Sequence, residues 1–145
     1  MITLIVGTQT GTAEFVADDI VSLCQSHNLD ISSTLTPEDL DLDTEQTWLF
    51  CTSTHGAGEL PDNLKPFETK LATQSDLSKI RYMIIALGDS SYDTYCQAGK
   101  ILETLLESKG AVKITETFNV DAMNDALPED IVLPWLEENL DKFSQ

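Results

Sequence analysis

Short, nearly continuous apolar runs recur along the chain and alternate with segments of helical spacing. The runs are ITLIV at 2–6, DISSTL at 30–35 (the weakest), TWLFCT at 47–52, YMIIAL at 82–87 and VKITETFNV at 112–120. Apolar residues that do not alternate with polar ones are typical of strands buried on both faces of a sheet. The runs therefore predict five parallel strands with helices on both sides.

Between the runs, apolar side chains recur three and four residues apart, which is the spacing of one helix face. Four such stripes lie at 16–24, 60–71, 101–106 and 135–143. Because proline disrupts a helix interior, Pro66 is expected in the first turn of the second helix, capped by Asp62 or Asn63. For the same reason Pro134 predicts that the last helix begins near Leu133.

Strands and helices alternate along the sequence and end in a helix, which indicates an α/β doubly wound fold. A chain of 145 residues can build one substantial core, so we expect a single domain over 1–145. The acidic segment PEDLDLDTEQ at 37–46 predicts a surface loop. In such sheets ligands bind at the carboxyl ends of the strands, where the strand order reverses.

The charge of the chain narrows the range of partners. It has 25 Asp and Glu against 8 Lys and Arg, a net charge of −17. Nucleic acids and anionic membranes repel such a protein, whereas a basic protein surface attracts it. The alternative, that the charge only keeps the protein soluble, stays open at this point.

The cysteines and the N-terminal segment bear on where the protein works. Cys24, Cys51 and Cys96 form no CxxC pair, and the first two lie among apolar residues expected in the core. The odd count favours a reducing compartment. The first apolar run is too short for a signal peptide or a membrane span. The sequence therefore predicts a cytoplasmic protein without membrane association.

Three loops that follow predicted strands are rich in Gly, Ser and Thr: GTQTGTAE at 7–14 (the first loop), STHGAGELPDN at 53–63 (the second loop) and GDSSYDTYC at 88–96 (the third loop). In the first loop, hydroxyl groups, the flexible Gly11 and the N–H groups of the following helix together favour anion binding. The loop lacks the lysine and the spacing of a P-loop. It therefore suits a phosphomonoester that is held and not transferred, although a plain helix N-cap at Thr10 or Thr12 is equally compatible.

The second and third loops carry aromatic side chains, and both loops are expected at the sheet edge that also carries the first loop. The second loop contains His55, and the third contains Tyr92 and Tyr95. A flat heteroaromatic ring could lie between His55 and Tyr92, with backbone groups along its edge. Each ring alone is compatible with ordinary surface packing. Together with a phosphate-binding loop on the same sheet edge, they favour one shared ligand.

These motifs carry a resemblance to a known family. Over its whole length the chain resembles short-chain flavodoxins, most closely those of the MioC type. TQTGTAEFVA, STHGAGELPDN and LGDSSYDTYC are also similar to the three flavin loops of the FMN domains of cytochrome P450 reductases. The resemblance implies a flavodoxin-like sheet of order 2-1-3-4-5, flavodoxin being itself the type example of FMN bound where that order reverses.

The resemblance also implies which residues contact FMN. Around the phosphate it implies Thr8, Gln9, Thr10, Gly11, Thr12 and Ala13. Along one face and the N5 edge of the isoalloxazine it implies Ser53, Thr54, His55, Gly56, Ala57 and Gly58. On the other face it implies Leu87, Gly88, Asp89, Tyr92, Tyr95 and Cys96, with Tyr92 stacked on the ring. Asp121 would lie near the pyrimidine or ribityl region. Many flavodoxins carry Trp or Tyr where His55 stands, and the chain lacks the insertion of long-chain flavodoxins.

As a member of this family the chain would be an electron carrier and not an enzyme. FMN would supply the redox chemistry, and the protein would supply binding, orientation and electrostatics. The implied partners are an NADPH-dependent flavodoxin reductase and a redox acceptor such as a radical or iron–sulfur enzyme, each meeting a monomeric carrier through a basic surface. The alternative is a small FMN-dependent reductase that acts on its own substrate.

Two protein classes of similar topology do not fit the residues. A response-regulator receiver needs an Asp at the end of the third strand, where this chain reads FCTST, and a Lys after the fifth, which reads TFNVD. A low-molecular-weight phosphatase needs Cys-x5-Arg, but the position six residues after Cys51 is Ala57. We find no Ser–His–acid or metal-ligand cluster, so no catalytic or metal residue is predicted. His27 is expected to cap the end of the first helix.

Overall fold

The computed structural model describes residues 1–8, 11–54, 58–88, 96–121 and 127–144. A parallel sheet runs in the order β2-β1-β3-β4-β5, and β6 also pairs with β4. The strands are β1 (Ile2–Gly7), β2 (Ile31–Thr34), β3 (Gln46–Thr52), β4 (Ile80–Gly88), β5 (Val112–Lys113) and β6 (Phe118–Asp121). The doubly wound fold and the order 2-1-3-4-5 are therefore confirmed, with two short segments sharing the fifth position.

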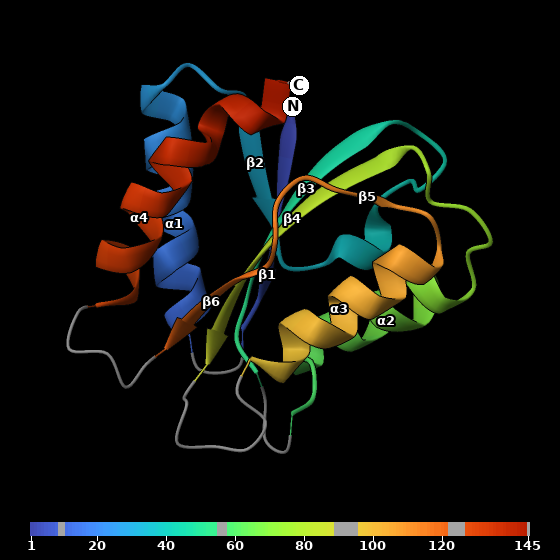
Figure 1. Ribbon diagram of the computed structural model, residues 1–145. Helices are drawn as coiled ribbons and strands as arrows, with labels where there is room; N and C mark the ends of the chain where they lie inside the picture. The colour runs from blue at the N-terminus through green and yellow to red at the C-terminus, as the bar shows by residue number, and fades with distance from the viewer. Residues whose placement is uncertain (9–10, 55–57, 89–95, 122–126, 145) are drawn as a thin grey trace.

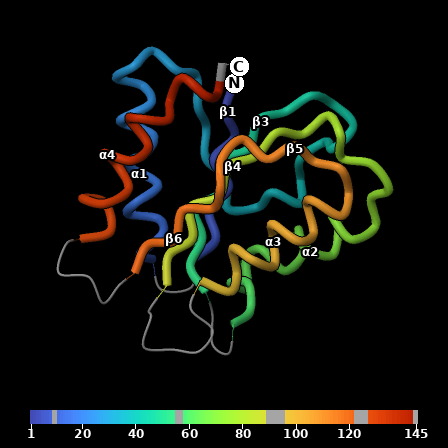
Figure 2. The backbone as a smooth tube through the Cα atoms, viewed as in Figure 1, coloured from blue at the N-terminus to red at the C-terminus, as the bar shows by residue number. Residues whose placement is uncertain are grey.

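The helices form two layers. They are α1 (Thr12–Ser26), α2 (Lys65–Ala72), α3 (Gln97–Ser108) and α4 (Pro128–Asn139), with short 3₁₀ helices η1 (Pro37–Asp39), η2 (Asp62–Leu64) and η3 (Leu140–Ser144). Figure 1 shows α1 and α4 side by side on one face of the sheet, and α2 with α3 on the other. Figure 2 shows the same layering along the backbone.

The strands read as continuous apolar runs because neighbouring residues enter two different cores. In β3, Leu49 and Cys51 pack with the α1 and α4 layer, whereas Trp48 and Phe50 pack with the α2 and α3 layer. All four side chains are fully buried. Burial of both faces therefore explains why the pattern lacks the polar alternation of a half-exposed sheet.

The fifth strand, expected as one run over 112–120, is broken. Lys113 Nζ lies 3.0 Å from a Glu103 carboxylate oxygen, and Thr117 Oγ1 donates to the other oxygen of Glu103 over 3.1 Å. Glu116 also reaches Lys113, at 3.2 Å. These polar side chains bond to α3 and to one another, and the chain between them leaves the strand before β6 resumes the pairing with β4.

Two helix boundaries differ from the sequence expectation. Pro66 does lie in the first turn of α2, but the N-cap residue is Leu64, and no described side chain caps the helix. Helix α4 begins at Pro128, not near residue 133, and Pro134 lies inside it. Pro134 removes one bond of the helix ladder. The packing of α4 offsets this loss, since Val132 and Leu136 are fully buried.

The acidic segment at 37–46 lies mostly at the surface, as expected, but it is anchored by two buried residues, Pro37 and Leu42. His27 is the C-cap residue of α1, also as expected: its N–H donates to the Cys24 carbonyl, and the N–H of Asn28 donates to the Gln25 carbonyl. No helix within the described ranges has the length and apolar character that crossing a bilayer requires.

Candidate functional site

The first loop joins the end of β1 to the start of α1. The N–H of Gly11 donates to Thr8 Oγ1 over 3.0 Å, so the Thr8 hydroxyl keeps its own hydrogen to donate. Gly11 is the N-cap residue of α1 and has a left-handed backbone with φ 95°, a conformation that favours glycine. No side chain among the described residues caps this helix end. The simple N-cap role for Thr12 is therefore wrong, and Thr10 lies outside the described residues.

The first turn of α1 directs backbone N–H groups toward the same loop. In an α-helix the N–H groups at 12–14 have no partner four residues back within the helix, and the first such bond runs from Phe15 to the Gly11 carbonyl, at 3.2 Å. Cys51 Sγ lies 3.8 Å from the Ala13 carbonyl and holds the helix start against β3. Hydroxyl and amide donors thus meet at a helix N-terminus, which is an arrangement suited to an anion.

The second loop is tied to its neighbours on both sides. Ser53 N–H donates to the Gly7 carbonyl over 3.0 Å, which joins the end of β3 to the end of β1. Thr54 Oγ1 accepts a hydrogen bond of 3.2 Å from Ala98 N–H, in the first turn of α3. Gly58 has a left-handed backbone with φ 104°. The loop therefore bridges the first loop and the helix that follows the third loop.

The third loop leaves β4 and enters α3 through Cys96. Cys96 is fully buried and left-handed, with φ 53°, and its Sγ lies 3.4 Å from the Ala86 carbonyl. Strand register pairs Gly88 with Asp121 at the end of β6. Asp121 and the start of the third loop therefore lie at the same edge of the sheet as the starts of the first and second loops.

Comparison with known proteins shows the family to which this chain belongs. The sequence profile of the Flavodoxin family matches residues 4–135. The chain belongs to the flavodoxin family. It is 40% identical over 136 residues to the Protein MioC homolog of Haemophilus influenzae, covering 93% of each chain. It is 33% identical to Flavodoxin YqcA of Escherichia coli K12, again over 93% of each. Its fold matches a point mutant of flavodoxin from Pseudomonas aeruginosa with a TM-score of 0.85, 30% identity and 99% of both chains covered.

Within this flavodoxin fold, the structure brings together those predicted site residues that it describes. The edge where the strands end carries Thr8, Gly11, Thr12, Ala13, Ser53, Thr54, Leu87, Gly88, Cys96 and Asp121. Gly58 lies farther along the second loop. The other predicted site residues lie outside the described residues: Gln9, Thr10, His55, Gly56, Ala57, Asp89, Tyr92 and Tyr95. They include the three aromatic side chains, those of His55, Tyr92 and Tyr95. Their roles stay predictions.

One side chain that sequence reasoning did not place at the site is Asn63, in η2. Its Oδ1 accepts from Thr8 N–H over 3.0 Å, and its Nδ2 donates to the Val6 carbonyl over 2.7 Å. Nδ2 also donates to the Leu35 carbonyl, which follows β2, over 3.0 Å. Sequence reasoning assigned Asn63 to a helix cap because an Asn just before a helix has that role by local rules. Only the tertiary contacts reveal the bridge.

The protonation of one charged cluster and of two thiols follows from their surroundings. Of the thiols, Cys51 is near the site at the end of β3, whereas Cys24 is in the last turn of α1, at the other end of that helix. Lys65 Nζ lies 3.0 Å from Glu59 and 3.1 Å from Asp62, and these hydrogen bonds raise the pKa of Lys65. Two carboxylates of the second loop region are thereby partly neutralised. Burial raises the pKa of the Cys51 thiol to about 12 and that of Cys24 to about 11. Both thiols are therefore neutral at physiological pH and unsuited to nucleophilic chemistry.

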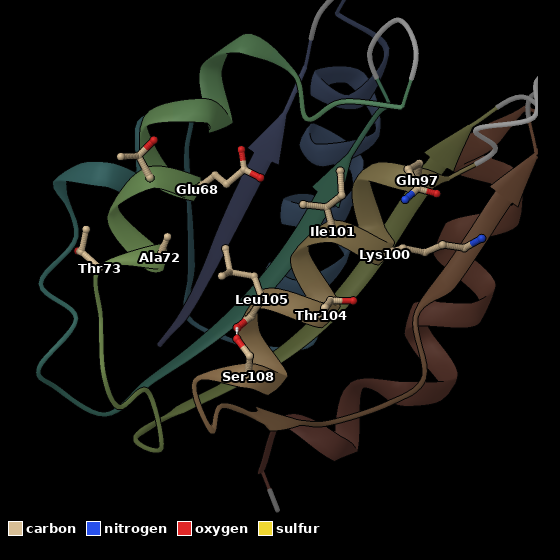
Figure 3. Close-up of a pocket in the computed structure, with 10 residues that line it drawn as sticks. Glu68, Ala72, Thr73, Gln97, Lys100, Ile101, Thr104, Leu105 and Ser108 are labelled. Carbon is tan, nitrogen blue, oxygen red and sulfur yellow. Dashed lines mark hydrogen bonds between the residues drawn. The ribbon is translucent and has the colours of Figure 1, made fainter.

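A separate groove of about 780 Å³ runs between α2 and α3 (Figure 3). Ile101 and Leu105 project into it from α3, and Ala72 lines it from α2. None of the predicted site residues that the structure describes lines it. The described residues also contain no group of three or more His, Cys, Asp or Glu placed to hold a metal ion.

Proposed function

We propose that the chain binds one FMN non-covalently at the carboxyl edge of the sheet and carries electrons from a reductase to an acceptor enzyme. The main support is the convergence of the first, second and third loops on that edge, within a fold whose family binds FMN. Sheets of this topology bind their ligands where the strand order reverses, which here is between β1 and β3.

The described residues fit the phosphate of FMN. A phosphomonoester offers oxygen acceptors and up to two negative charges. The Thr8 hydroxyl and the N–H groups at 12–14 are donors, and the positive end of the α1 dipole faces the same place. Gly11 keeps the approach free of a side chain. A nucleoside triphosphate would call for a lysine at this position, but no Lys or Arg occurs before Lys65.

FMN, when bound, supplies the redox chemistry, and the chain's own residues hold and surround it. The bond from Ala98 N–H to Thr54 fixes the second loop against α3, and Cys96 fixes the end of the third loop by its buried contact with Ala86. These ties hold the described ends of the two loops, Thr54 and Cys96, against α3 and β4. A carrier that must accept and release electrons quickly benefits from a site whose supports are already in place.

The direct test is to titrate the purified protein with flavins. We expect a yellow protein with one FMN, which binds much more tightly than riboflavin because riboflavin lacks the phosphate. A colourless protein that does not quench FMN fluorescence would reject the proposal. Consumption of NADPH by the flavin-loaded protein alone, with no reductase present, would instead support the alternative of a small reductase.

We further propose that partners approach the helical layer formed by α1 and α4, which we call the acidic face. Of the 8 Lys and Arg, all but Lys142 lie within 65–113, and only 6 of the 25 Asp and Glu lie there. Neither α1 nor α4 contains a basic residue; their acids are Glu14, Asp18, Asp19, Glu129, Asp130, Glu137 and Glu138. A basic protein surface is therefore drawn toward this side of the molecule.

The acidic face begins at the edge that carries the site. Figure 1 shows α1 and α4 both starting at the end of the sheet where β4 and β6 finish. Phe15, in the first turn of α1, is 74% exposed, and Leu127, the N-cap residue of α4, is 59% exposed. Exposed apolar side chains that form one patch within a charged surface mark interaction sites, and we propose that Phe15 and Leu127 form such a patch. They would give a partner a dry contact close to the flavin.

Electron transfer to cytochrome c, a small basic haem protein, tests the acidic face. Exposed charges are screened beyond about 8 Å at physiological salt, so the rate should fall steeply as ionic strength rises. Asp18→Asn with Asp130→Asn should slow transfer at low salt and flatten this dependence. The matched control, Asp39→Asn with Asp43→Asn, removes the same charge from outside the face and should have a smaller effect. Equal effects of both pairs, or a flat salt dependence, would reject the face as the docking side.

A further inference from the structure

The geometry points to Asn63 as the residue that positions the first loop for the phosphate of the flavin. It touches neither substrate nor cofactor in this role and acts through the backbone of Thr8. The inference rests on the proposed FMN site, and it concerns how the chain itself shapes that site.

The Asn63 side chain uses one acceptor and two donors at once. Oδ1 accepts from Thr8 N–H at 3.0 Å, and Nδ2 donates to the carbonyls of Val6 at 2.7 Å and Leu35 at 3.0 Å. An amide side chain has both donor and acceptor groups at its tip. Carboxylate, hydroxyl or apolar side chains cannot supply the same set. One residue of η2 thus joins the end of β1, the first loop and the segment after β2.

The consequence for the phosphate runs through Thr8. Because Thr8 N–H is engaged by Asn63, the peptide at the end of β1 is held in one orientation. In that orientation the Thr8 hydroxyl oxygen accepts from Gly11 N–H at 3.0 Å. The turn that starts α1 and directs its N–H groups is therefore fixed from two sides, by Thr8 inside the loop and by Asn63 outside it.

Strand β1 and η2 pack closely beside Asn63, which leaves little room for another side chain to replace its bonds. Gly7 lies between Val6 and Thr8. A Cβ built on it would come within 2.5 Å of the Cδ1 atom of Leu64, which is the residue after Asn63. Strand β1 therefore lies directly against η2, which brings the Asn63 amide within reach of backbone groups in both β1 and the first loop. Loss of the amide would leave partly buried polar groups without these bonds, which is costly.

The test compares ligand affinities and hydrogen exchange among variants. Asn63→Leu keeps the approximate size and removes all three bonds. We expect it to weaken FMN binding roughly tenfold, and riboflavin binding much less, because only FMN uses the phosphate donors. Asn139→Leu is the matched control: Asn139 is also partly buried, and it donates to the Trp135 carbonyl within α4. It should leave the ratio of the two affinities unchanged.

Hydrogen exchange in the ligand-free protein gives a readout that does not depend on flavin. Thr8 N–H should exchange about ten times faster or more in Asn63→Leu, while Ile114 N–H, bonded to the Tyr82 carbonyl, should not change. Asn63→Asp keeps an acceptor for Thr8 N–H and loses both donated bonds. It should therefore retain most of the Thr8 protection. Asn63→Ala also removes all three bonds, and it carries the exchange test if Asn63→Leu does not fold.

The outcomes separate this inference from the proposed function. Equal loss of FMN and riboflavin affinity in Asn63→Leu, or unchanged affinity for both, would overturn the positioning role. Unchanged exchange at Thr8 in Asn63→Leu or Asn63→Ala would overturn it as well. A parent protein that binds FMN no better than riboflavin would reject the proposed function instead, and hydrogen exchange alone would then decide whether Asn63 holds the first loop.

Discussion

Replacing Gly7 with alanine tests how closely the strands pack beneath the site. A Cβ on Gly7 would lie 2.5 Å from Leu64 Cδ1 and 2.9 Å from Thr52 Cβ, and still closer to Thr52 Oγ1. Both neighbours are fully buried, so neither can turn out to solvent. Overpacking of this kind costs about 1–3 kcal/mol. Because several contacts are too short at once, we expect Gly7→Ala to lie near the upper end of that range.

The assay is urea unfolding of the ligand-free protein, with Gly110→Ala as the control. Gly110 has φ 86°, and a Cβ on it would find its nearest neighbour, Asp76 Oδ1, at 3.9 Å. Its substitution therefore costs only backbone strain, roughly 1 kcal/mol. Gly7→Ala should be clearly the less stable of the two variants. A free energy of unfolding within about 0.5 kcal/mol of the parent would refute the close packing of β1, β3 and η2.

Two further substitutions address the anion site. Thr8→Val removes the acceptor of Gly11 N–H and the Thr8 donor, so FMN affinity in a fluorescence titration should fall about tenfold, with recovery in Thr8→Ser and little change for riboflavin. Glu14 is exposed and lies in the first turn of α1, with Oε2 3.7 Å from the position of a Gly11 Cβ. Glu14→Gln should therefore tighten FMN binding by roughly two- to fivefold at low salt, and less at high salt, because a charge that repels the phosphate is removed.

The part of the fold that rests on long apolar runs could be predicted from the sequence. Strands β1, β3 and β4 are buried on both faces, so their composition alone identifies them. The break between β5 and β6 could not be predicted, because Lys113 and Thr117 are each compatible with a strand. In the structure both bond to Glu103, on a helix that precedes them, where the pairing of β5 with β4 ends.

The predicted start of α4, near Leu133, was wrong for a related reason. Local rules penalise Pro134 inside a helix, whereas the tertiary structure provides a compensating contact. The ring of Trp135, next to it, stacks on Phe118 of β6 with centroids 4.4 Å apart and an interplanar angle of 1°. Pro128, not Pro134, takes the first-turn position that suits proline. A local preference was thus overridden by a contact that sequence spacing does not reveal.

The candidate site also has a part that could be predicted from the sequence and a part that could not. The first loop could be located from the sequence because its residue types and its place between a strand and a helix are a local signal. The bridge made by Asn63 could not, because its three partners lie 28 to 57 residues away in the chain. Residue types can therefore indicate what a loop binds, whereas the groups that hold the loop in shape become visible only in the folded chain.

Tyr82 gives the last prediction, which concerns stability at alkaline pH. Its side chain is only 1% exposed, and its hydroxyl has no hydrogen-bond partner among the described residues. Burial, and after it the negative charge of Glu107 and Glu103, raises the pKa of Tyr82 to about 12. An unfolded tyrosine has a pKa of about 10. Above that pH the unfolded chain loses the proton first, so stability falls as the pH rises from about 10 to 12.

Tyr82→Phe removes this titration and also the unpaired buried hydroxyl. We therefore expect the variant to be as stable as the parent or slightly more stable at pH 7, since an unsatisfied buried polar group costs free energy. At pH 11 it should gain about 1 kcal/mol relative to the parent, measured by urea unfolding at both pH values. Other tyrosines and lysines titrate in both proteins, so the difference between the two isolates Tyr82. A constant difference from pH 7 to 11 would show that the phenol ionises as readily in the folded protein as in the unfolded chain, and the burial argument would fail.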